Sequence, residues 1–595
     1  MKYLHKLAVL LSLALLLAAI AVMLLNKPAA GYEISLYAAY PAYFFVFLIL
    51  AYVISTLSVL YCVFYGKVNK LTSVNVFVIM AINFILLFQP YIRGYALFQR
   101  EDAMTHLGYV KDILLTGHIG HSNFYPFIHV ETANLQLLSG LDLMFIRELL
   151  PYTCYLVYIF FIYLLVSSVI KDKKFGLLSL LFASIPFMSD CLINFTSSGT
   201  LFFLIPLIMY VLYRHISRFS FATSLLSLIL VLAVPFMHPE FAFLLILIAL
   251  VLAVTLYIYR SRKAHVSAPD ESLLAIVSFI LIVFLSWILS FRQFFIYILI
   301  FYGIFLKVVT GGSYGAGVSP VTTYSSMLSK SQIVIVDLLR LFFTLYGPIL
   351  IYILLGLFFF VILSYHFYKT KKYDIYVISF MSLFAILAIF TVVLIGMPLI
   401  ITYNRIFKYV LLLSVILISI GFFYAIKKRE ARKNVIVSII MVILSISMLL
   451  SMFSLYPSPI IYSYNYQVTH MELAGAGWFL DHGNTNVMPV YLFYTFGRFA
   501  NEIQGCEQSQ YSNYKYSIIS IDSLPPDHFN YHKKAYLGDS YPSDRYLFIN
   551  KLTRMFYLDL WPTINRYNAG DFYRLDRDAS VSCIYTNGEM DIYDI

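Results

Sequence analysis

The sequence predicts a polytopic α-helical membrane protein with a mixed α/β domain at its C-terminal end. Of its 595 residues, 61% are hydrophobic and only 12% are charged, and the mean hydropathy is +0.83. These values lie far outside the range of soluble domains. Long apolar runs follow one another up to residue 456, whereas residues 457–595 contain none that could cross a bilayer. We therefore expect a transmembrane domain over 1–456 and a soluble domain over 457–595.

Thirteen apolar runs approach the length of about 20 residues that a helix needs to cross a bilayer. They lie near 5–26, 36–65, 72–90, 151–170, 175–189, 198–213, 220–236, 240–258, 272–291, 341–365, 374–398, 406–426 and 434–455. Ionisable residues are almost absent from the middle of these runs, which argues against the ion path of a pump. The first run is longer than a typical signal-peptide core and Asn26-Lys27-Pro28 is a poor cleavage site, so we expect a retained span.

The positions of Lys and Arg predict how the spans are oriented. With a cytoplasmic N-terminus, the short inner loops hold 20 basic residues and the longer outer loops before the tail hold 11. The positive-inside rule then places the loop over 91–150, the loop over 292–340 and the C-terminal tail outside the cytoplasm. The apolar run 293–309 is expected to be an interfacial helix, because crossing there would put the basic segment 369–372 outside. Residues 310–326, rich in Gly, Ser and Thr, are expected to form a mobile loop.

Charge is distributed unevenly along the chain. The net charge is +11, yet residues 456–595 carry 10 Lys and Arg against 15 Asp and Glu. The basic excess therefore lies in the membrane part, where it predicts cytoplasmic anchoring and gives no footprint of a nucleic-acid partner. Among the five cysteines, Cys506 and Cys583 share the tail, where a disulfide and two free thiols are both open.

The stretch from Arg93 to Glu131 is the most polar part of the chain before the tail. Its ionisable and aromatic side chains include Glu101, Asp102, His106, Tyr109, Lys111, Asp112, His118, Tyr125 and His129. Helical spacing predicts an amphipathic helix over 100–116 that Gly117 ends as a C-terminal cap. One stripe of this helix carries Asp102, His106 and Tyr109, and a neighbouring stripe carries Glu101, Thr105, Gly108 and Asp112.

Two interpretations of this stretch are open. Acids at the start of a helix are stabilised by about 0.3–1 kcal/mol, which alone would account for Glu101 and Asp102. The Tyr125-Pro126 turn and His129 follow, in an aromatic segment that must return to the membrane. An acid, an imidazole and a phenol on one surface, followed by such a segment, favour a functional site.

The tail is expected to fold as a small mixed α/β domain. Helical spacing over 470–483 is followed by a strand-like run at 487–494, and further short strands are expected at 516–521 and 582–587. The sequence shows no phosphate-binding glycine loop, zinc-ligand spacing or nucleophile elbow. The tail therefore offers no motif that assigns a reaction.

An acidic pair in the first outer loop, an aromatic residue seven positions on, then a glycine and a Tyr-Pro turn together resemble the polyprenyl-phosphate-dependent glycosyltransferases of the GT-C superfamily. The acids here are Glu101-Asp102, the aromatic residue is Tyr109 and the turn is Tyr125-Pro126. The layout of thirteen spans and a soluble outer domain is similar to that of oligosaccharyltransferase catalytic subunits. The motif covers some thirty residues and is most similar to uncharacterised archaeal members.

The resemblance implies transfer of a sugar, with inversion, from a polyprenyl- or dolichyl-phosphate-linked donor to a glycan, protein or lipid acceptor on the outer face. Asp102, with Glu101 as its competitor, would be the general base. The acceptor would be bound by His106, Tyr109, Tyr125, His129, His238 and Glu240. The donor phosphate would be held by Arg405 and Lys408, with Arg292 and Arg340 as weaker candidates. Asp102 and Arg405 would then line one cavity, although Arg405 also fits lipid-headgroup snorkelling.

The sequence departs from this family in two ways. In place of the Trp-Trp-Asp-Tyr-Gly motif of oligosaccharyltransferases it has only Trp478-Phe479-Leu480-Asp481-His482-Gly483. Adjacent Glu101-Asp102 also fits poorly the spaced acids that bind a metal in that family, so no metal site is assigned. A divalent metal, Mg²⁺ or Mn²⁺, stays open as a cofactor, with Asp190 and Glu240 as conceivable extra ligands. The alternative function is a non-catalytic membrane transporter or scaffold for lipid-linked glycans.

Overall fold

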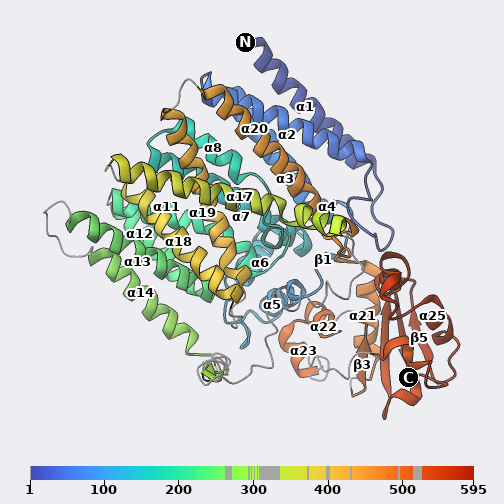
Figure 1. Ribbon diagram of the computed structural model, residues 1–595. Helices are drawn as coiled ribbons and strands as arrows, with labels where there is room; N and C mark the ends of the chain where they lie inside the picture. Colours follow the sequence, from blue (N-terminus) through green and yellow to red (C-terminus); the bar gives the residue numbers. More distant parts are fainter. Residues whose placement is uncertain are drawn as a thin grey trace.

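Long helices form most of the molecule, and a small sheet domain stands at one end of the helical bundle (Figure 1). The computed structural model describes residues 2–218, 220–261, 271–291, 335–370, 374–396, 403–428, 432–484, 486–492, 496–512 and 525–595, with isolated residues between 295 and 306. The expected loop over 310–326 and strand over 516–521, and most of the expected interfacial helix over 293–309, lie outside the described residues.

Ten helices of the described chain are long and apolar enough to cross a membrane. They are α1 (Lys2–Leu25), α2 (Ala42–Phe64), α3 (Lys70–Leu87), α7 (Leu143–Ile170), the continuous run of α10 (Ser197–Thr200), a 3-10 turn (Leu201–Leu204) and α11 (Ile205–Ser217), α13 (Pro239–Ser261), α17 (Ile335–Thr370), α18 (Ile375–Gly396), α19 (Tyr403–Lys428) and α20 (Lys433–Ser454). Each overlaps one of the thirteen predicted runs. Their length and composition indicate a protein embedded in a membrane.

The other three predicted runs also form helices, but shorter ones. α12 (Phe221–Met237) and the part Ala275–Ile288 of α14 (Glu271–Ile288) are apolar helices below span length. The run 175–189 does not form one span, because α8 (Lys173–Ala183) has only 11 residues. At 1.5 Å per residue it is about 16 Å long, half of what a bilayer core requires. Pro186 cannot continue a helix, and the short α9 (Ser189–Leu192) follows it.

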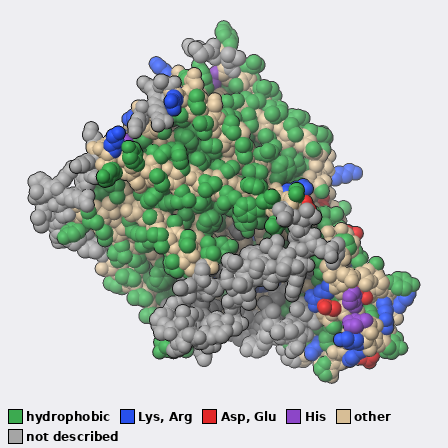
Figure 2. All heavy atoms as spheres, viewed as in Figure 1, with side chains coloured by type: hydrophobic (Ala, Val, Ile, Leu, Met, Phe, Trp, Pro, Cys, Tyr) green, Lys and Arg blue, Asp and Glu red, His purple; other side chains and the backbone are tan. Residues whose placement is uncertain are grey.

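The helical bundle exposes large apolar side chains that a soluble protein would bury. Leu17, Phe77 and Ile389 expose 62%, 64% and 66% of their surface. In Figure 2, apolar side chains cover the face of the bundle, whereas charged side chains of both signs gather on the sheet domain. A continuous apolar face of this extent is suited to contact with lipid tails.

The loop between α3 and α7 folds into short elements at one end of the bundle. They are α4 (Gln89–Ile92), β1 (Leu97–Phe98), α5 (Asp102–Thr116) and α6 (Phe127–Ser139). α5 confirms the predicted helix, and Gly117 ends it with φ of 72°, a left-handed conformation that glycine adopts without strain. β1 pairs antiparallel with β2 (Gln467–Val468) of the tail. The first loop and the tail therefore lie at the same end of the bundle.

The tail forms a mixed α/β domain, as predicted. Its elements are α21 (His470–His482), β3 (Met488–Tyr491), α22 (Phe496–Gln504), α23 (Cys506–Ser512), β4 (Arg545–Asn550), α24 (Lys551–Met555), α25 (Ala569–Leu575), β5 (Ser582–Thr586) and β6 (Met590–Asp594). The strand order is β3-β4-β6-β5, with β3 and β4 parallel and the other pairs antiparallel. On β4, Phe548 joins the large core shared with the helical bundle, whereas Leu547 and Ile549 join a second core that includes α25.

A buried ion pair joins the first loop to the tail. Arg100 Nη1 lies 2.5 Å from Glu472 Oε1, and the two side chains are 2% and 3% exposed. Glu472 also accepts a hydrogen bond from Asn550 Nδ2 at 2.6 Å, and Arg100 donates to the carbonyl oxygen of Gln467. Because an unpartnered buried charge is strongly destabilising, these contacts require the loop and the tail to be folded together.

The two tail cysteines are free thiols in separate environments. Cys506 is buried against α5, and its thiol donates to the carbonyl oxygen of Thr105 at 3.3 Å. Cys583 is exposed on strand β5. The disulfide that the sequence left open is therefore not formed.

Candidate functional site

One of the two stripes predicted on α5 packs against the tail. A Cβ atom on Gly108 would lie 2.5 Å from the backbone oxygen of Asn501 and 2.7 Å from Cys506 Sγ, so no larger residue fits there. Asp112, one turn further on, accepts a hydrogen bond from the backbone N–H of Cys506 at 3.2 Å. Burial raises the pKa of Asp112 to about 6, although this hydrogen bond opposes the shift. The tail helices α22 and α23 thus hold α5 in place.

The other stripe of α5 contributes to a buried pair of imidazoles. His106 Nδ1 lies 2.7 Å from His129 Nε2, and His129 Nδ1 lies 3.0 Å from Asn123 Oδ1. His106 is 7% exposed, while His129 and Asn123 are exposed by 1% or less. Burial lowers the pKa of His106 to about 4, which the charge of Asp102 opposes, and burial also lowers the pKa of His129. Both rings are therefore neutral near pH 7.

Aromatic rings extend from this pair to the turn between α12 and α13. The ring of Tyr109 lies 5.1 Å from that of His129. The ring of Tyr125 lies 6.1 Å from that of His106 and 5.1 Å from that of His238, which occupies the turn. The structure thus brings these five predicted acceptor-binding residues into one chain of contacts.

A buried carboxylate links His238 to α19. Glu240, in the first turn of α13, lies 3.2 Å from Lys408 Nζ through Oε1 and 3.8 Å from His238 Nδ1 through Oε2. Lys408 also donates to the carbonyl oxygen of Ser198 at 3.0 Å. Burial, followed by the charges of Lys408 and Arg405, lowers the pKa of His238 to about 3. The imidazole is therefore neutral, and Glu240 balances the charge of Lys408.

Arg405 and Lys408 line a cavity of about 480 Å³ between α19, α17 and the segment around α9 and α10. Leu345, Ile349 and Leu411 are among the apolar side chains of its wall, and other wall positions are polar. Within the described part of the chain, no carboxylate forms an ion pair with Arg405, whereas Lys408 has Glu240. The cavity therefore combines an apolar wall with a guanidinium that no described carboxylate pairs with.

The two carboxylates predicted to be catalytic lie apart from this cavity. Asp102 begins α5, where its side chain is 68% exposed and lies 2.9 Å from Arg498 Nη2 of α22. Glu101 precedes the helix and is exposed as well. Neither is among the described residues that line the cavity of Arg405. The expected single cavity with Asp102 and Arg405 in its wall is thus not found in the described part of the molecule.

Of the two weaker phosphate candidates, the structure describes Arg340 alone. Arg292 lies outside the described residues. Arg340 lies in the second turn of α17, so it belongs to a helix and not to the predicted loop. It is exposed and is not among the residues that line the cavity. Of the four predicted cations, the structure brings together Arg405 and Lys408.

Two of the carboxylates considered as metal ligands are paired with cations in the structure. Asp102 pairs with Arg498, and Glu240 pairs with Lys408. Asp190 lies on α9, but its side chain is outside the described part of the structure. Among the described residues, no three His, Cys, Asp or Glu side chains come together as a ligand set.

Three contacts of the site were missed from the sequence. Arg498 lies 396 residues from Asp102 and Ser198 lies 210 residues from Lys408, so no local spacing reveals either contact. Asn123 lies only six residues before His129, inside the polar stretch. Because Asn123 and His129 are close in the sequence, this contact could have been considered from the sequence alone.

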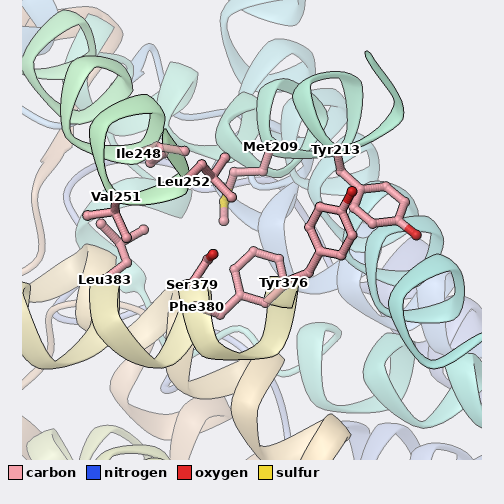
Figure 3. Close-up of a pocket in the computed structure, with 9 residues that line it drawn as sticks. All are labelled: Met209, Tyr213, Ile248, Val251, Leu252, Tyr376, Ser379, Phe380 and Leu383. Atoms are coloured by element: carbon pink, nitrogen blue, oxygen red, sulfur yellow. The ribbon is translucent and has the colours of Figure 1, made fainter. Parts of the chain in front are cut away.

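A second cavity, between α11, α13 and α18, is unrelated to these residues (Figure 3). It is lined by Met209, Tyr213, Ile248, Val251, Leu252, Tyr376, Ser379, Phe380 and Leu383. Its volume of about 20 Å³ has room for roughly one water molecule. It is a packing gap and not a ligand site.

No family model matches the chain, and none of the curated proteins searched matches its sequence. The site itself offers two chemically different halves. One half is the neutral pair of His106 and His129, and the other is the cavity with Arg405. Glu240 lies between them, in contact with His238 on one side and Lys408 on the other.

Proposed function

We propose that the protein is a membrane glycosyltransferase that moves a sugar, with inversion, from a polyprenyl- or dolichyl-phosphate-linked donor to an acceptor on the outer face. The observation that carries the proposal is the cavity of about 480 Å³ in which Arg405 and Lys408 meet an apolar wall. A lipid phosphate requires both features, because its chain must stay in an apolar environment and its anionic head needs charged donors.

Arg405 is the better placed of the two cations for the phosphate. It lies in the first turn of α19, where the N-terminal end of the helix dipole favours an anion. No described carboxylate competes for its guanidinium, which binds phosphate oxygens bidentately. Lys408, one turn further, is already balanced by Glu240 at 3.2 Å. In this proposal Arg405 binds the donor phosphate and Lys408 orients Glu240.

The acceptor is proposed to bind on the other side of Glu240, beside Tyr125, His238 and His106. Inversion requires the acceptor oxygen to approach the sugar from the face opposite the leaving phosphate. The contact chain from Lys408 through Glu240 to His238 supports two adjoining half-sites of this kind. Asp102, the base expected from the family resemblance, is ion-paired with Arg498 and would have to exchange that partner for the acceptor.

The test compares Arg405→Gln with Arg340→Gln in lipid nanodiscs. Loss of a hydrogen bond to a charged group costs about 1.5–3 kcal/mol, so Arg405→Gln is expected to weaken polyprenyl-phosphate binding by about tenfold to a hundredfold. Arg340, an exposed arginine of α17 outside the cavity, is the matched control and should bind like the wild type. Equal binding by both variants would remove the cavity from the donor site.

A non-catalytic lipid-phosphate transporter or scaffold is the second candidate, favoured by the exposed and ion-paired state of Asp102. The two candidates differ in one measurement, the transfer of a radiolabelled sugar from a polyprenyl-phosphate-linked donor to any glycan, peptide or lipid acceptor. Binding that depends on Arg405 without any transfer would favour the transporter or scaffold.

A further inference from the structure

The hydrogen-bonded series of Asn123, His129 and His106 has a direction. An amide oxygen can only accept, so His129 Nδ1 must donate to Asn123 Oδ1. A neutral imidazole carries one proton, and His129 Nε2 is then left with a lone pair that accepts from His106 Nδ1. The single proton of a neutral His106 is thereby placed on Nδ1. Its Nε2 is left unprotonated and able to accept a proton.

We propose that His106 Nε2 is the general base of the transfer reaction, with His129 and Asn123 as positioning residues that fix its tautomer. The inference rests on the proposed glycosyltransferase function and deepens it by naming the group that accepts the proton. The family resemblance implied that Asp102 is the general base, and the present inference assigns that role to His106.

In the proposed step, the acceptor hydroxyl gives its proton to His106 Nε2 while its oxygen forms a bond to the sugar anomeric carbon. The bond from that carbon to the phosphate oxygen breaks, and the polyprenyl phosphate leaves with the bonding electron pair. His106 becomes an imidazolium that still donates from Nδ1 to His129 Nε2. The proton then leaves to solvent, so charge and atoms balance without a further reactant.

Several groups surround the His106 ring. They are Asp102 on its own helix α5, Tyr125 on the loop between α5 and α6, His129 on α6, His238 in the turn between α12 and α13, and Arg498 on α22. Asp102 favours the charged form of His106 and Arg498 disfavours it. Asp102 therefore has a place in the proposal as the negative charge that stabilises the imidazolium, one helical turn away.

The geometry distinguishes the two candidate bases. Asp102 is 68% exposed and its carboxylate is engaged by Arg498 at 2.9 Å. His106 is 7% exposed, and its ring lies 6.1 Å from the ring of Tyr125, which in turn contacts the ring of His238. A general base needs a lone pair that is held in a fixed tautomer, and the buried hydrogen-bonded series supplies one on His106 Nε2.

The first test is His106→Asn, with His118→Asn as its control. The asparagine amide can occupy the place of Nδ1 and keep donating to His129, but it has no counterpart of Nε2. General-base removal is expected to lower kcat by about 100-fold or more without lowering donor affinity. His118 is exposed, in the loop after Gly117, and its replacement should leave kcat unchanged. A kcat for His106→Asn within a few-fold of the control would overturn the proposal.

The second test changes only the far end of the series. Asn123→Asp keeps an oxygen acceptor for His129 and adds negative charge, so kcat should be retained. The added charge raises the pKa of His106, and the acid limb of the kcat/KM profile should therefore move to higher pH than in the wild type. Asn123→Leu removes the acceptor and should lower kcat by tenfold or more. If the acid limb of the kcat/KM profile lies at the same pH in Asn123→Asp as in the wild type, Asn123 does not act on His106 through His129.

A spectroscopic readout separates failure of this inference from failure of the proposed function. In protein with ¹⁵N-labelled histidine, the signals lost in His106→Asn should show a protonated Nδ1 and an unprotonated Nε2 at pH 7. If His106 instead carries its proton on Nε2 in a protein that transfers sugar, the proposed role of His106 as the base is wrong and the glycosyltransferase proposal stands. The expected tautomer in a protein that transfers no sugar would overturn the catalytic role of His106 together with the proposed function.

Discussion

The two halves of the candidate site differ in how their polar groups are partnered. Around α5, His106 and His129 are buried, neutral and joined by hydrogen bonds. At the start of α19, Arg405 is charged, exposed and without a carboxylate partner in the described structure. A fixed and neutral set of groups suits proton transfer, whereas an unpaired cation beside an apolar wall suits an anionic lipid. Partners, more than residue types, distinguish the two roles.

The largest effect is expected where the two halves meet, at Glu240. Glu240→Gln leaves Lys408 with the Ser198 carbonyl and neighbouring rings as its partners among the described residues. Breaking a buried pair in this way costs about 3 kcal/mol. The same change frees Lys408 to bind an anion, so the affinity for polyprenyl phosphate should rise while the melting temperature falls.

Glu131→Gln is the control for that comparison, because Glu131 is exposed on α6 and should change neither quantity. Thermal unfolding and lipid-phosphate titration of the two variants measure both effects. Equal melting temperatures of Glu240→Gln and Glu131→Gln would mean that the pair of Glu240 and Lys408 does not stabilise the fold.

A smaller effect is expected on acidification. The folded pKa of His106, about 4, lies below its ordinary value of 6.5, so its contribution to stability is complete above pH 6.5 and is lost as the pH falls toward 4. The loss by pH 5 is on the order of 1–2 kcal/mol. Asp112, whose raised pKa of about 6 acts in the opposite direction, contributes equally to wild type and variants.

The comparison of melting temperatures at pH 7.5 and pH 5 measures this contribution. His106→Asn has no imidazole to protonate at that position and should lose less stability between the two pH values than the wild type. An equal loss in the two proteins would show that burial does not lower the pKa of His106 in the folded protein.

The smallest effect is expected at the ion pair of Asp102 and Arg498. Their side chains are 68% and 33% exposed, and solvent-screened pairs of this kind contribute less than about 1 kcal/mol. Arg498→Gln should therefore shift the melting temperature by only a few degrees and change transfer by less than about threefold. A loss of transfer above tenfold would return Asp102 and its partner to the centre of the mechanism.

Local periodicity predicted much of this architecture, while long-range contacts could not be predicted. The two stripes of α5 were correctly separated by helical spacing, and Gly117 was recognised as the cap because its role is local. The run 175–189 was taken as a span since hydropathy does not register the interruption at Pro186. Asp102 is ion-paired with Arg498, which lies 396 residues away in the sequence, and no local spacing reveals such a contact.

The close approach of Gly108 to Asn501 and Cys506 has a consequence for biogenesis. The ribosome releases α5 long before α22 and α23, since the contact between Asp112 and Cys506 spans 394 residues. During translation α5 is made before its contact helices, and a nascent chain that stops before α22 cannot form these contacts. The contacts of Gly108 and Asp112 with the tail therefore form only after α22 and α23 have been translated.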